Sequence, residues 1–536
     1  MRQDAAYVTT TIPYVNARPH VGHALEYVQA DAPARYRRQL GRTVRLQTGS
    51  DDNALKNALA AAAEGIPVAA LVARNARAFA EVLDALDVGV DGFLRTSTDP
   101  GHRAGVAALW QACATAGAIT RKTYSGLHCV GCEQFYAPEE LTPDGLCPEH
   151  LRPPERVEEE NAFFRLSRYA GELRERIASG ELRIVPDERR REVLSFIDAG
   201  LTDFSISRSV ERARGWGIPV PGDPSQVVYV WFDALANYLT ALGYGAPLDA
   251  GAPNYRTFWA ECPERLHVIG KGVLRFHAVY WPAMLLAAGL PLPTTIFVHG
   301  YFTVGGRKMS KSLNNAVDPR DVMAACGADA LRWYLLREAH PTADCDFSVS
   351  RVAARHDVDL ANDLGNVVHR TVTMLHRYRE GRVPPTVPED AATALRMEAA
   401  DVPARVRAAM DAFDPRAALD AVWALVARCN RAIEEAAPWT LHQRERQGKP
   451  AAAAQLDAVL YGAAEGLRLV AVHLEPFLPG AARSLLAQLG AGDEAAQPYA
   501  ERVRWGGLRP GTPTAPPQPL FPRLASVENA RRPPEG

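Results

Sequence analysis

Apolar and polar positions in the first part of the chain form short units that each run from strand to loop to helix. Residues 5–16 are rich in β-branched and aromatic residues, and a Pro-His-Val-Gly-His turn leads from them into residues 23–41, which have helical composition. Pro33 predicts a kink or a later start for that helix. Residues 43–65 repeat the order of strand, polar turn and Ala-rich helix. This alternation predicts a parallel α/β sheet.

The alternation stops in the middle of the chain and then resumes. A cysteine-bearing segment and a charged stretch occupy residues 115–215, which indicates an insertion. Apolar strands and helical segments return in residues 226–306, where we expect the second half of the sheet. From about residue 350 to 490 the apolar residues recur at helical spacing, which predicts a helical bundle. The last thirty or so residues are rich in Pro and Gly and predict an extended surface tail.

Composition is that of a globular protein with several domains. The chain has 536 residues, 47% hydrophobic and 23% charged, which is too long for one compact core. Lys and Arg total 60 against 62 Asp and Glu, so the net charge of −2 gives no global attraction to polyanions, and any contact with nucleic acid must be local. The sequence has no run of about 18 apolar residues and no signal-peptide profile at its start, so we expect a cytoplasmic protein that does not enter a membrane.

Three of the eight cysteines form a compact pattern with a histidine. Cys129-x-x-Cys132 and Cys147-x-x-His150 are separated by residues 133–146, a spacing that fits a tetrahedral zinc knuckle better than a disulfide framework. The alternative is a degenerate knuckle that binds no metal. We expect one structural Zn²⁺ ion and a reducing compartment.

Two further motifs carry groups suited to phosphate. His20 and His23 flank Val21-Gly22 where a strand meets a helix, so both imidazoles can share the first helical turn, and such a helix start attracts phosphate. The alternatives for these two histidines are a chance arrangement and a pair of metal ligands. Far along the chain, two glycines precede Lys308-Met309-Ser310-Lys311-Ser312, which puts two ammonium groups on one loop. A solvated basic loop is the alternative there.

Pro-His-Val-Gly-His together with Lys-Met-Ser-Lys-Ser resembles the paired signature of the class I aminoacyl-tRNA synthetases. In that family both elements bind ATP and stabilise the pentavalent α-phosphate as the amino-acid carboxylate displaces pyrophosphate. The resemblance therefore implies ATP with Mg²⁺, and it implies catalytic roles for His20, His23, Lys308 and Lys311. By the same resemblance the ATP-binding residues are His20, Gly22, His23, Gly270, Val298 and Lys311.

Segments over nearly the whole chain resemble the methionyl-tRNA synthetases in order and spacing, among them residues 7–23, 214–223, 227–238 and 266–272. The resemblance implies a methionine pocket whose amine partner is Asp51 and whose lining is Ile12, Pro13, Tyr14, Trp231, Leu235, Tyr238, Phe276 and His277. Aromatic and aliphatic groups suit a polarizable thioether. Without the resemblance, core packing is the simpler explanation for the aromatic residues.

The helical region carries polar residues and an indole that suit single-stranded RNA. Asn362, Asn366 and Arg370 recur every four residues, and Trp439 follows Pro438. Capping or packing is the alternative for the two asparagines. The family reads the CAU anticodon by stacking and by hydrogen bonds to bases, so these four residues are the expected anticodon contacts. The expected partners are tRNA(Met) and L-methionine, without DNA or membrane, and the expected state is a monomer.

The resemblance implies a Rossmann-type parallel-sheet catalytic domain with an inserted zinc-knuckle domain, followed by an all-α anticodon-binding bundle. The predicted boundaries are 1–115 and 216–300 for the two catalytic halves, 116–215 for the insertion, 301–350 for the Lys-Met-Ser-Lys-Ser loop and stem-contact region, 351–505 for the bundle and 506–536 for the tail.

The chain departs from the family pattern at two places. Asp51-Asp52-Asn53-Ala54 stands where Asp-Glu-His-Gly or Asp-Asp-Ala-His-Gly is usual, and Gly272 stands where Gly-Lys-Asp has its carboxylate. Asn53 can preserve a hydrogen bond, whereas Gly272 cannot replace a carboxylate. Ordinary divergence with compensation and a specialised paralogue both remain open, as does a catalytically silent RNA-binding protein, against which the complete histidine and lysine motifs argue.

Overall fold

The computed structural model describes residues 4–130, 134–149, 151–246, 255–309, 315–385 and 393–524. Its backbone contacts form two compact units. Unit 1 comprises Met1–Pro19, Thr43–Leu83 and Val90–His299, and unit 2 comprises His20–Arg42, Asp84–Gly89 and Gly300–Gly536.

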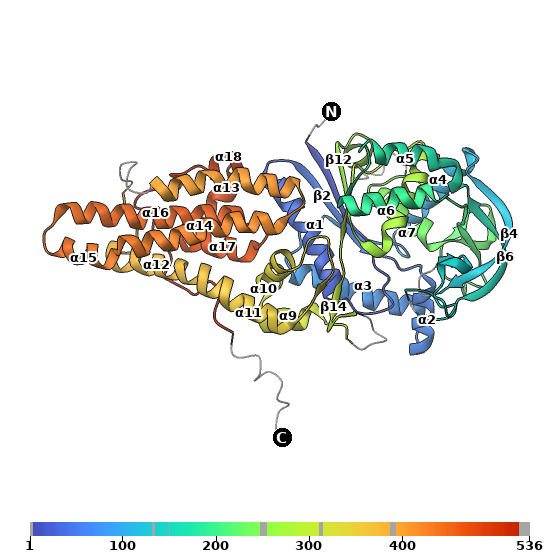
Figure 1. Cartoon of the computed structure of the whole chain (residues 1–536), viewed down its shortest axis with the longest axis horizontal. Coiled ribbons are helices and arrows are strands. Elements are labelled where there is room, and N and C mark those ends of the chain that lie inside the picture. Colours follow the sequence, from blue (N-terminus) through green and yellow to red (C-terminus); the bar gives the residue numbers. More distant parts are fainter. Residues whose placement is uncertain are drawn as a thin grey trace, which may run out of the picture. The chain divides into compact units, whose positions relative to one another are not determined.

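A six-stranded sheet is the centre of unit 1 (Figure 1). Its order is β3-β2-β1-β12-β13-β7, and every neighbouring pair is parallel. The strands are β1 (Ala5–Thr10), β2 (Thr43–Ser50), β3 (Gly92–Arg95), β7 (Arg183–Val185), β12 (Glu264–Gly270) and β13 (Thr295–His299). All six residues of β1 are buried, as expected for a strand covered on both faces. The predicted parallel α/β sheet is confirmed.

The strand order reverses at β1, which pairs with β2 on one side and with β12 on the other. In open parallel sheets, chain segments diverge at such a point and leave a crevice beyond the carboxyl ends of the strands. Residues that directly follow β1, β2 and β12 therefore belong to the part of the fold where ligands bind.

Unit 1 also contains α-helices. They are α2 (Leu55–Glu64), α3 (Val68–Ala85), α4 (Pro100–Thr115), α5 (Ala170–Ala178), α6 (Asp187–Asp198), α7 (Val230–Thr240) and α8 (Trp281–Ala287). The helices α4 and α7 approach closely at Gly105, where an added Cβ would lie 2.4 Å from the side chain of Thr240. Trp110 and Phe232 meet edge-to-face between the same two helices, with centroids 5.3 Å apart. This contact helps to fix α7, which carries the predicted pocket residues Trp231, Leu235 and Tyr238.

The predicted insertion contains antiparallel structure. Its four-stranded sheet has the order β5-β4-β6-β8, formed by β4 (Ile119–Cys129), β5 (Gln134–Tyr136), β6 (Glu155–Phe164) and β8 (Phe204–Ser205). A three-stranded sheet follows, of β9 (Ser207–Ser209), β10 (Pro219–Val220) and β11 (Asp223–Val228). The same stretch of chain also supplies β7, which pairs with β13 at the edge of the parallel sheet.

Unit 2 begins with α1 (Val21–Gln39), which contains Pro33. The later start that Pro33 predicted is wrong, because the helix begins twelve residues before the proline. Buried Arg332 holds the middle of α1, since its Nη2 donates to Asp31 Oδ2 over 2.7 Å and its Nε to Phe477 O over 2.7 Å. The guanidinium thus joins α1 to the segment that follows the long helix α16 (Pro450–Leu474).

The rest of unit 2 is mainly helical, which confirms the predicted bundle (Figure 1, yellow to red). Its other helices are α9 (Pro319–Cys326), α10 (Ala328–Trp333), α11 (Val349–Arg355), α12 (Asn366–Arg379), α13 (Thr393–Asp411), α14 (Pro415–Ala436), α15 (Pro438–Arg446), α17 (Pro479–Gln488) and α18 (Tyr499–Arg502). A small sheet pairs β14 (Phe302–Val304) with β15 (Arg307–Lys308), which both precede α9, and with β16 (Cys345–Asp346), which lies between α10 and α11. Residues 460–474 of α16 are buried on every side, as in a helix at the centre of a bundle.

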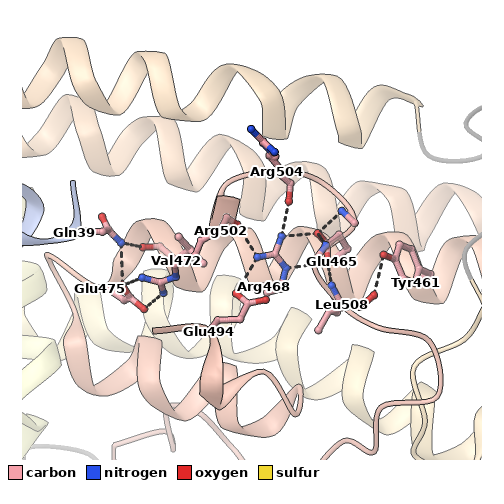
Figure 2. Close-up of polar contacts among 12 residues, drawn as sticks. Gln39, Tyr461, Glu465, Arg468, Val472, Glu475, Glu494, Arg502, Arg504 and Leu508 are labelled. Atoms are coloured by element: carbon pink, nitrogen blue, oxygen red, sulfur yellow. Dashed lines mark hydrogen bonds and ion pairs between the residues drawn. The ribbon is translucent and has the colours of Figure 1, made fainter. Parts of the chain in front are cut away.

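A buried polar network ties the chain after α18 to α16 (Figure 2). Arg468 donates to both oxygens of Glu465, over 2.6 and 2.9 Å, and to the carbonyl oxygens of Arg502 and Arg504, each over 2.7 Å. Glu465 also accepts from the backbone N–H groups of residues 506, 507 and 508. Both side chains are fully buried, so the carboxylate and the guanidinium replace water for each other and for the surrounding backbone.

Among the described residues, no single helix has the length and apolar character needed to cross a membrane. The bent pair α2 and α3, with 104° between its helices, meets the criterion on length and composition alone.

Candidate active site

The segments after β1 and β2 meet at the carboxyl edge of the sheet. Tyr14 and Asp51 form an isolated parallel bridge, and the Asp51 N–H donates to Pro13 O over 2.9 Å. Asp51 is buried, with an exposed fraction of 2%, whereas Ile12, Pro13 and Tyr14 are partly exposed. The structure therefore brings four of the predicted methionine-pocket residues together at the strand-order reversal.

The loop that carries Asp51 is held by several hydrogen bonds. Asn57 Nδ2 donates to Asp51 O over 2.9 Å and to Asp52 O over 2.8 Å. The carboxylate of Asp52 accepts from Arg95 Nη2 over 2.8 Å and from Ser97 Oγ over 2.6 Å. The carboxylate of Asp52 is thereby bonded to donors of the protein itself, so Asp51 is the better candidate to bind the ammonium group of a ligand.

Aromatic side chains line the start of α7. The rings of Trp231 and Phe276 stack with centroids 3.6 Å apart and planes 7° from parallel, and Tyr14 meets Trp231 edge-on at 6.3 Å. The Trp231 Nε1–H is buried and finds no acceptor among the described residues, which is uncommon in a protein interior. Leu235 and Tyr238 follow on the same helix and are almost fully buried.

Two imidazoles beside this aromatic group are held by hydrogen bonds. His277 Nδ1 lies 2.9 Å from the carbonyl of Val273, which can only accept, so Nδ1 donates to it, and His277 Nε2 lies 2.8 Å from the Tyr238 hydroxyl. His267 Nε2 accepts from Trp281 Nε1 over 3.2 Å.

Burial holds the pKa of His267 well below its usual value, and His277 and Arg265 lower it further. The ring of His267 is therefore neutral at pH 7. A carboxylate beside aromatic rings and the neutral imidazole of His267 suits a cationic amine with an apolar side chain.

The predicted phosphate-binding histidines lie at the start of α1, in unit 2. His20 is the N-cap residue, and its Nδ1 accepts from Gly22 N over 3.1 Å, while His23 Nδ1 accepts from His20 N over 3.1 Å. Because both Nδ1 atoms accept, a neutral ring carries its proton on Nε2, the atom suited to donate to a phosphate oxygen. Gly22 leaves room for the His20 ring in this position, since an added Cβ would lie 2.8 Å from His20 Cε1 and would displace the ring.

The segment after the Lys-Met-Ser-Lys-Ser string meets the same helix start. Val21 N donates to Val317 O over 3.0 Å. Lys311 lies outside the described residues, and for Lys308 the structure describes only the backbone, in β15. The proposed roles of the two lysines stay predictions. Of the other predicted ATP-binding residues, Gly270 ends β12 and buried Val298 lies in β13.

The structure places both departures from the family pattern. Ala54 has φ −66° and ψ 140°, an ordinary extended conformation, and its buried methyl group packs with Tyr229 and Val230 beside Tyr14 and Trp231. Asn53 Nδ2 donates to Asp233 Oδ2 over 2.7 Å, so the amide does make a side-chain hydrogen bond. Gly272 is exposed in a short 3₁₀ turn, Lys271–Val273.

Sequence reasoning missed the side chains behind this loop. Asp233 is fully buried in the first turn of α7, where it accepts from Asn53 and also from His102 Nε2 over 2.6 Å. Trp216 Nε1 donates to Asp52 O over 2.7 Å. The available signal was a lone carboxylate within the apolar helix Val230–Thr240, because a buried charge needs partners.

Two of the four predicted zinc ligands are described. Cys129 and Cys147 are buried in one small cluster with Tyr136, and Cys147 Sγ lies 3.7 Å from Tyr136 Oη. Cys132 and His150 lie outside the described residues, and the described residues alone hold no group of three or more potential ligands. Two buried thiols in one cluster fit the donor set that zinc prefers, and the full site stays a prediction.

The predicted anticodon contacts lie in unit 2. Asn362 belongs to the π-helical segment His356–Gly365, while Asn366 and Arg370 belong to α12. Both asparagines are exposed, as is Trp439 with an exposed fraction of 50%. Arg370 Nη1 donates to Asn430 Oδ1 over 3.0 Å. Asn362 Oδ1 accepts from Arg523 Nη2 over 2.8 Å, so this side chain has a partner within the described residues. The role of all four residues in RNA binding stays a prediction.

Comparison with known proteins covers almost the whole chain. Residues 6–153 and 150–372 match the model of the tRNA synthetases class I (M), and residues 385–532 match the anticodon binding domain of methionyl tRNA ligase. The methionine–tRNA ligase of Mycobacterium bovis is 41% identical over 99% of both chains. That of Brucella suis is 40% identical over 98% of this chain and 99% of its own.

Solved structures show the same similarity. Mycobacterium tuberculosis methionyl-tRNA synthetase in complex with methionyl-adenylate is 40% identical and superposes with a TM-score of 0.91, covering 97% of this chain and 100% of that one. Its free form superposes with a TM-score of 0.83 at 38% identity, over 98% of this chain and 99% of that one. The chain therefore belongs to the methionyl-tRNA synthetases of class I.

Proposed function

We propose that the chain is a methionine–tRNA ligase, which activates L-methionine with ATP and transfers it to the 3′ end of tRNA(Met). The observation that carries the proposal is the group at the carboxyl edge of the sheet, where the Asp51 bridge to Tyr14 lies beside the stacked rings of Trp231 and Phe276. An ammonium partner next to an apolar aromatic wall is what methionine requires.

In the first step, a carboxylate oxygen of methionine attacks the α-phosphorus of ATP. The new O–P bond forms as the bond to pyrophosphate breaks, which yields methionyl-adenylate. Asp51 pairs with the substrate ammonium and holds the carboxylate in line. His20 and His23 donate from Nε2 to phosphate oxygens, and Lys308 and Lys311 neutralise the charge that develops on the pentavalent phosphate. Preorganised donors suffice because the enzyme forms no covalent bond.

In the second step, a ribose hydroxyl of the terminal adenosine attacks the methionyl carbonyl, and AMP leaves. The anticodon is read by Asn362, Asn366, Arg370 and Trp439, through hydrogen bonds to bases and stacking on the indole. The exposure of the two asparagines and of Trp439 supports this role.

The proposal also covers the metal ions, the oligomeric state, the cellular location and the domain boundaries. Mg²⁺ accompanies ATP, and one Zn²⁺ is held by Cys129, Cys132, Cys147 and His150, where it stabilises the insertion. The protein is a cytoplasmic monomer that acts on no DNA and enters no membrane. Its domains follow the boundaries predicted from the sequence, and no disulfide joins the cysteines of the described residues, which supports a reducing compartment.

ATP–pyrophosphate exchange with a panel of amino acids tests the first step. We expect exchange with methionine and little with leucine, isoleucine or valine. Exchange only with an amino acid other than methionine would overturn the assignment. Aminoacylation of a tRNA(Met) transcript, with an anticodon-substituted transcript as comparison, tests the second step and separates a ligase from a silent RNA-binding protein.

Paired variants test the assignment of Asp51. Asp51→Asn removes the charge that faces the ammonium, and we expect it to lower kcat/KM for methionine at least about hundredfold, since a lost hydrogen bond to a charged group costs about 1.5–3 kcal/mol and the ion pair adds to it. Asp203→Asn is the matched control, because Asp203 pairs with exposed Lys122 in the insertion. Equal effects of the two changes would refute the role of Asp51.

A further inference from the structure

The carboxylate of Asp233 is the centre of a buried chain of hydrogen bonds in unit 1. Its Oδ2 accepts from Asn53 Nδ2 over 2.7 Å, and its Oδ1 lies 2.6 Å from His102 Nε2. His102 Nδ1 in turn lies 2.7 Å from Thr240 Oγ1. Asp233 and His102 have no exposed surface, and Asn53 and Thr240 have 9% and 5%. Four polar side chains are therefore satisfied by one another away from water.

This chain of hydrogen bonds holds α7 at both ends. Asp233 lies in the first turn of α7 and Thr240 is its last residue, seven positions later and thus on the same face. One imidazole, from the first turn of α4, bonds to both. The close approach of the two helices at Gly105 leaves little room for α7 to slide or rotate.

The other end of the chain of hydrogen bonds is the loop that carries Asp51. Asn53 follows Asp51 by two residues, and its neighbour Asp52 is fixed through N–H donation to Thr96 Oγ1 over 2.9 Å. Asn53 Nδ2 also donates to Thr96 O over 3.3 Å. Because this loop is held by the sheet, the bond from Asn53 to Asp233 transmits the position of the loop to α7.

Two halves of the proposed methionine pocket meet at this bond. Asp51 lies on the loop, and Trp231 lies on α7, two residues before Asp233. The gap between the Asp51 carboxylate and the Trp231 ring sets whether the ammonium and the thioether of one ligand can be held together. A displacement of about 1 Å in such a site is enough to cost about hundredfold in rate.

We propose that Asn53 is a positioning residue for methionine, which through its hydrogen bond to Asp233 sets the placement of Asp51 relative to Trp231 and thereby the KM for methionine. The proposal rests on the proposed function. It also gives Asn53, where the chain departs from the family pattern, a specific part in the site. An amide serves because it is a neutral donor that reaches the carboxylate, whereas a carboxylate at position 53 would repel Asp233.

The test is a charge exchange between the two partners. Asn53→Asp places two carboxylates in contact, and we expect it to raise the KM for methionine and the calorimetric Kd for methionine about tenfold, with the KM for ATP changed less than about twofold. The double variant Asn53→Asp with Asp233→Asn restores one amide and one carboxylate, and we expect it to recover most of the loss. His102 still finds an acceptor in the new amide oxygen.

Two neutral variants keep the test decisive if Asn53→Asp fails to fold. Asn53→Ser is too short to reach Asp233, so we expect it to raise the KM for methionine about tenfold. Asn53→His keeps a donor, and a cavity of about 20 Å³ beside Asn53, Trp216 and Tyr229 offers some room for the larger ring. We expect the KM of that variant to stay within about threefold of the wild type.

Asn161→Asp is the matched control. Asn161 is a buried amide in β6 that donates to the carboxylate of Glu159 over 3.3 Å, so the change also brings two carboxylates together, but in the inserted sheet. We expect a lower melting temperature and an unchanged KM for methionine. A merely structural role for Asn53 predicts the same result for both sites.

Failure of the proposed function and failure of the positioning role of Asn53 give different results. Wild-type protein without methionine-dependent exchange would overturn the proposed function. Active wild-type protein combined with an unchanged KM in the Asn53 variants, or with no recovery in the double variant, would overturn the positioning role alone.

Discussion

Replacement of Glu465 by Gln should destabilise the helical unit more than any exposed charge removal. Glu465 accepts five hydrogen bonds, from Arg468 Nε and Nη2 and from the N–H groups of residues 506, 507 and 508 (Figure 2). Glutamine keeps the shape of the side chain but turns one acceptor oxygen into a donor. At least two of the five bonds must then be lost, because each oxygen of Glu465 serves two or more donors.

The burial of Glu465 and Arg468 sets how much the free energy of unfolding should fall in this variant. Glu465 and Arg468 each have a side-chain exposed fraction of 0%, so the change leaves a guanidinium with one carboxylate partner fewer and no access to water. Removal of one member of a buried pair costs about 3–5 kcal/mol. Glu494, 2.9 Å from Arg468 Nη1, remains and offsets part of that loss. We therefore expect about 3 kcal/mol, a large share of the roughly 5–15 kcal/mol that stabilises a typical domain.

Two measurements check this expectation. Denaturation in urea gives the change in the free energy of unfolding, and hydrogen exchange followed by mass spectrometry reports on the amides of residues 506–508, which should lose protection. Glu435→Gln is the control, since Glu435 pairs with Arg428 at 3.1 Å with 62% of its side chain exposed, and an exposed pair contributes less than about 1 kcal/mol. A loss below about 1 kcal/mol for Glu465→Gln, with unchanged exchange at residues 506–508, would refute the reasoning.

Burial, together with Arg468 and Arg502, lowers the pKa of His473 to about 3. Below about pH 6.5 the unfolded chain therefore binds a proton that the folded chain does not, so the free energy of unfolding should be full above pH 6.5 and about 1.4 kcal/mol lower at pH 5.5. His473→Leu should remove that part of the pH dependence in urea titrations. Gly22→Ala should lower kcat for pyrophosphate exchange about hundredfold with little change in the KM for methionine, because the new Cβ displaces the His20 ring; an unchanged kcat would contradict the role of that turn. Cys147→Ser should reduce zinc measured by atomic emission from about one ion per chain to a small fraction, and equal zinc content in both proteins would exclude this thiol as a ligand.

The layout of the elements was readable from local pattern. Alternating strand and helix signals predict the parallel sheet because a strand buried on both faces and the helix that follows it each leave a local periodicity. The predicted bundle follows in the same way from helical spacing. The edge strand β7 was not predicted, because only three residues of the inserted region form it and their pairing with β13 is nonlocal.

Pro33 shows the limit of local rules. A proline inside a helix loses one hydrogen bond, which predicts a kink or a later start. In the structure the helix starts at Val21, since the burial of α1 along most of its length and the Arg332 contact to Asp31 stabilise helix on both sides of the proline. Tertiary packing thus outweighs a local penalty of about 3 kcal/mol.

By itself the sequence determined the sheet, the bundle and the motif residues, since these depend on residue type and on spacing along the chain. Only the tertiary structure decided which side chains support them. The spacing of Glu465 and Arg468 by three residues looks like an ordinary surface pair, and Asn53 lies 180 residues from Asp233. Their burial and mutual contact are properties of the packed chain, where the cost of desolvating a charge makes each partner depend on the other.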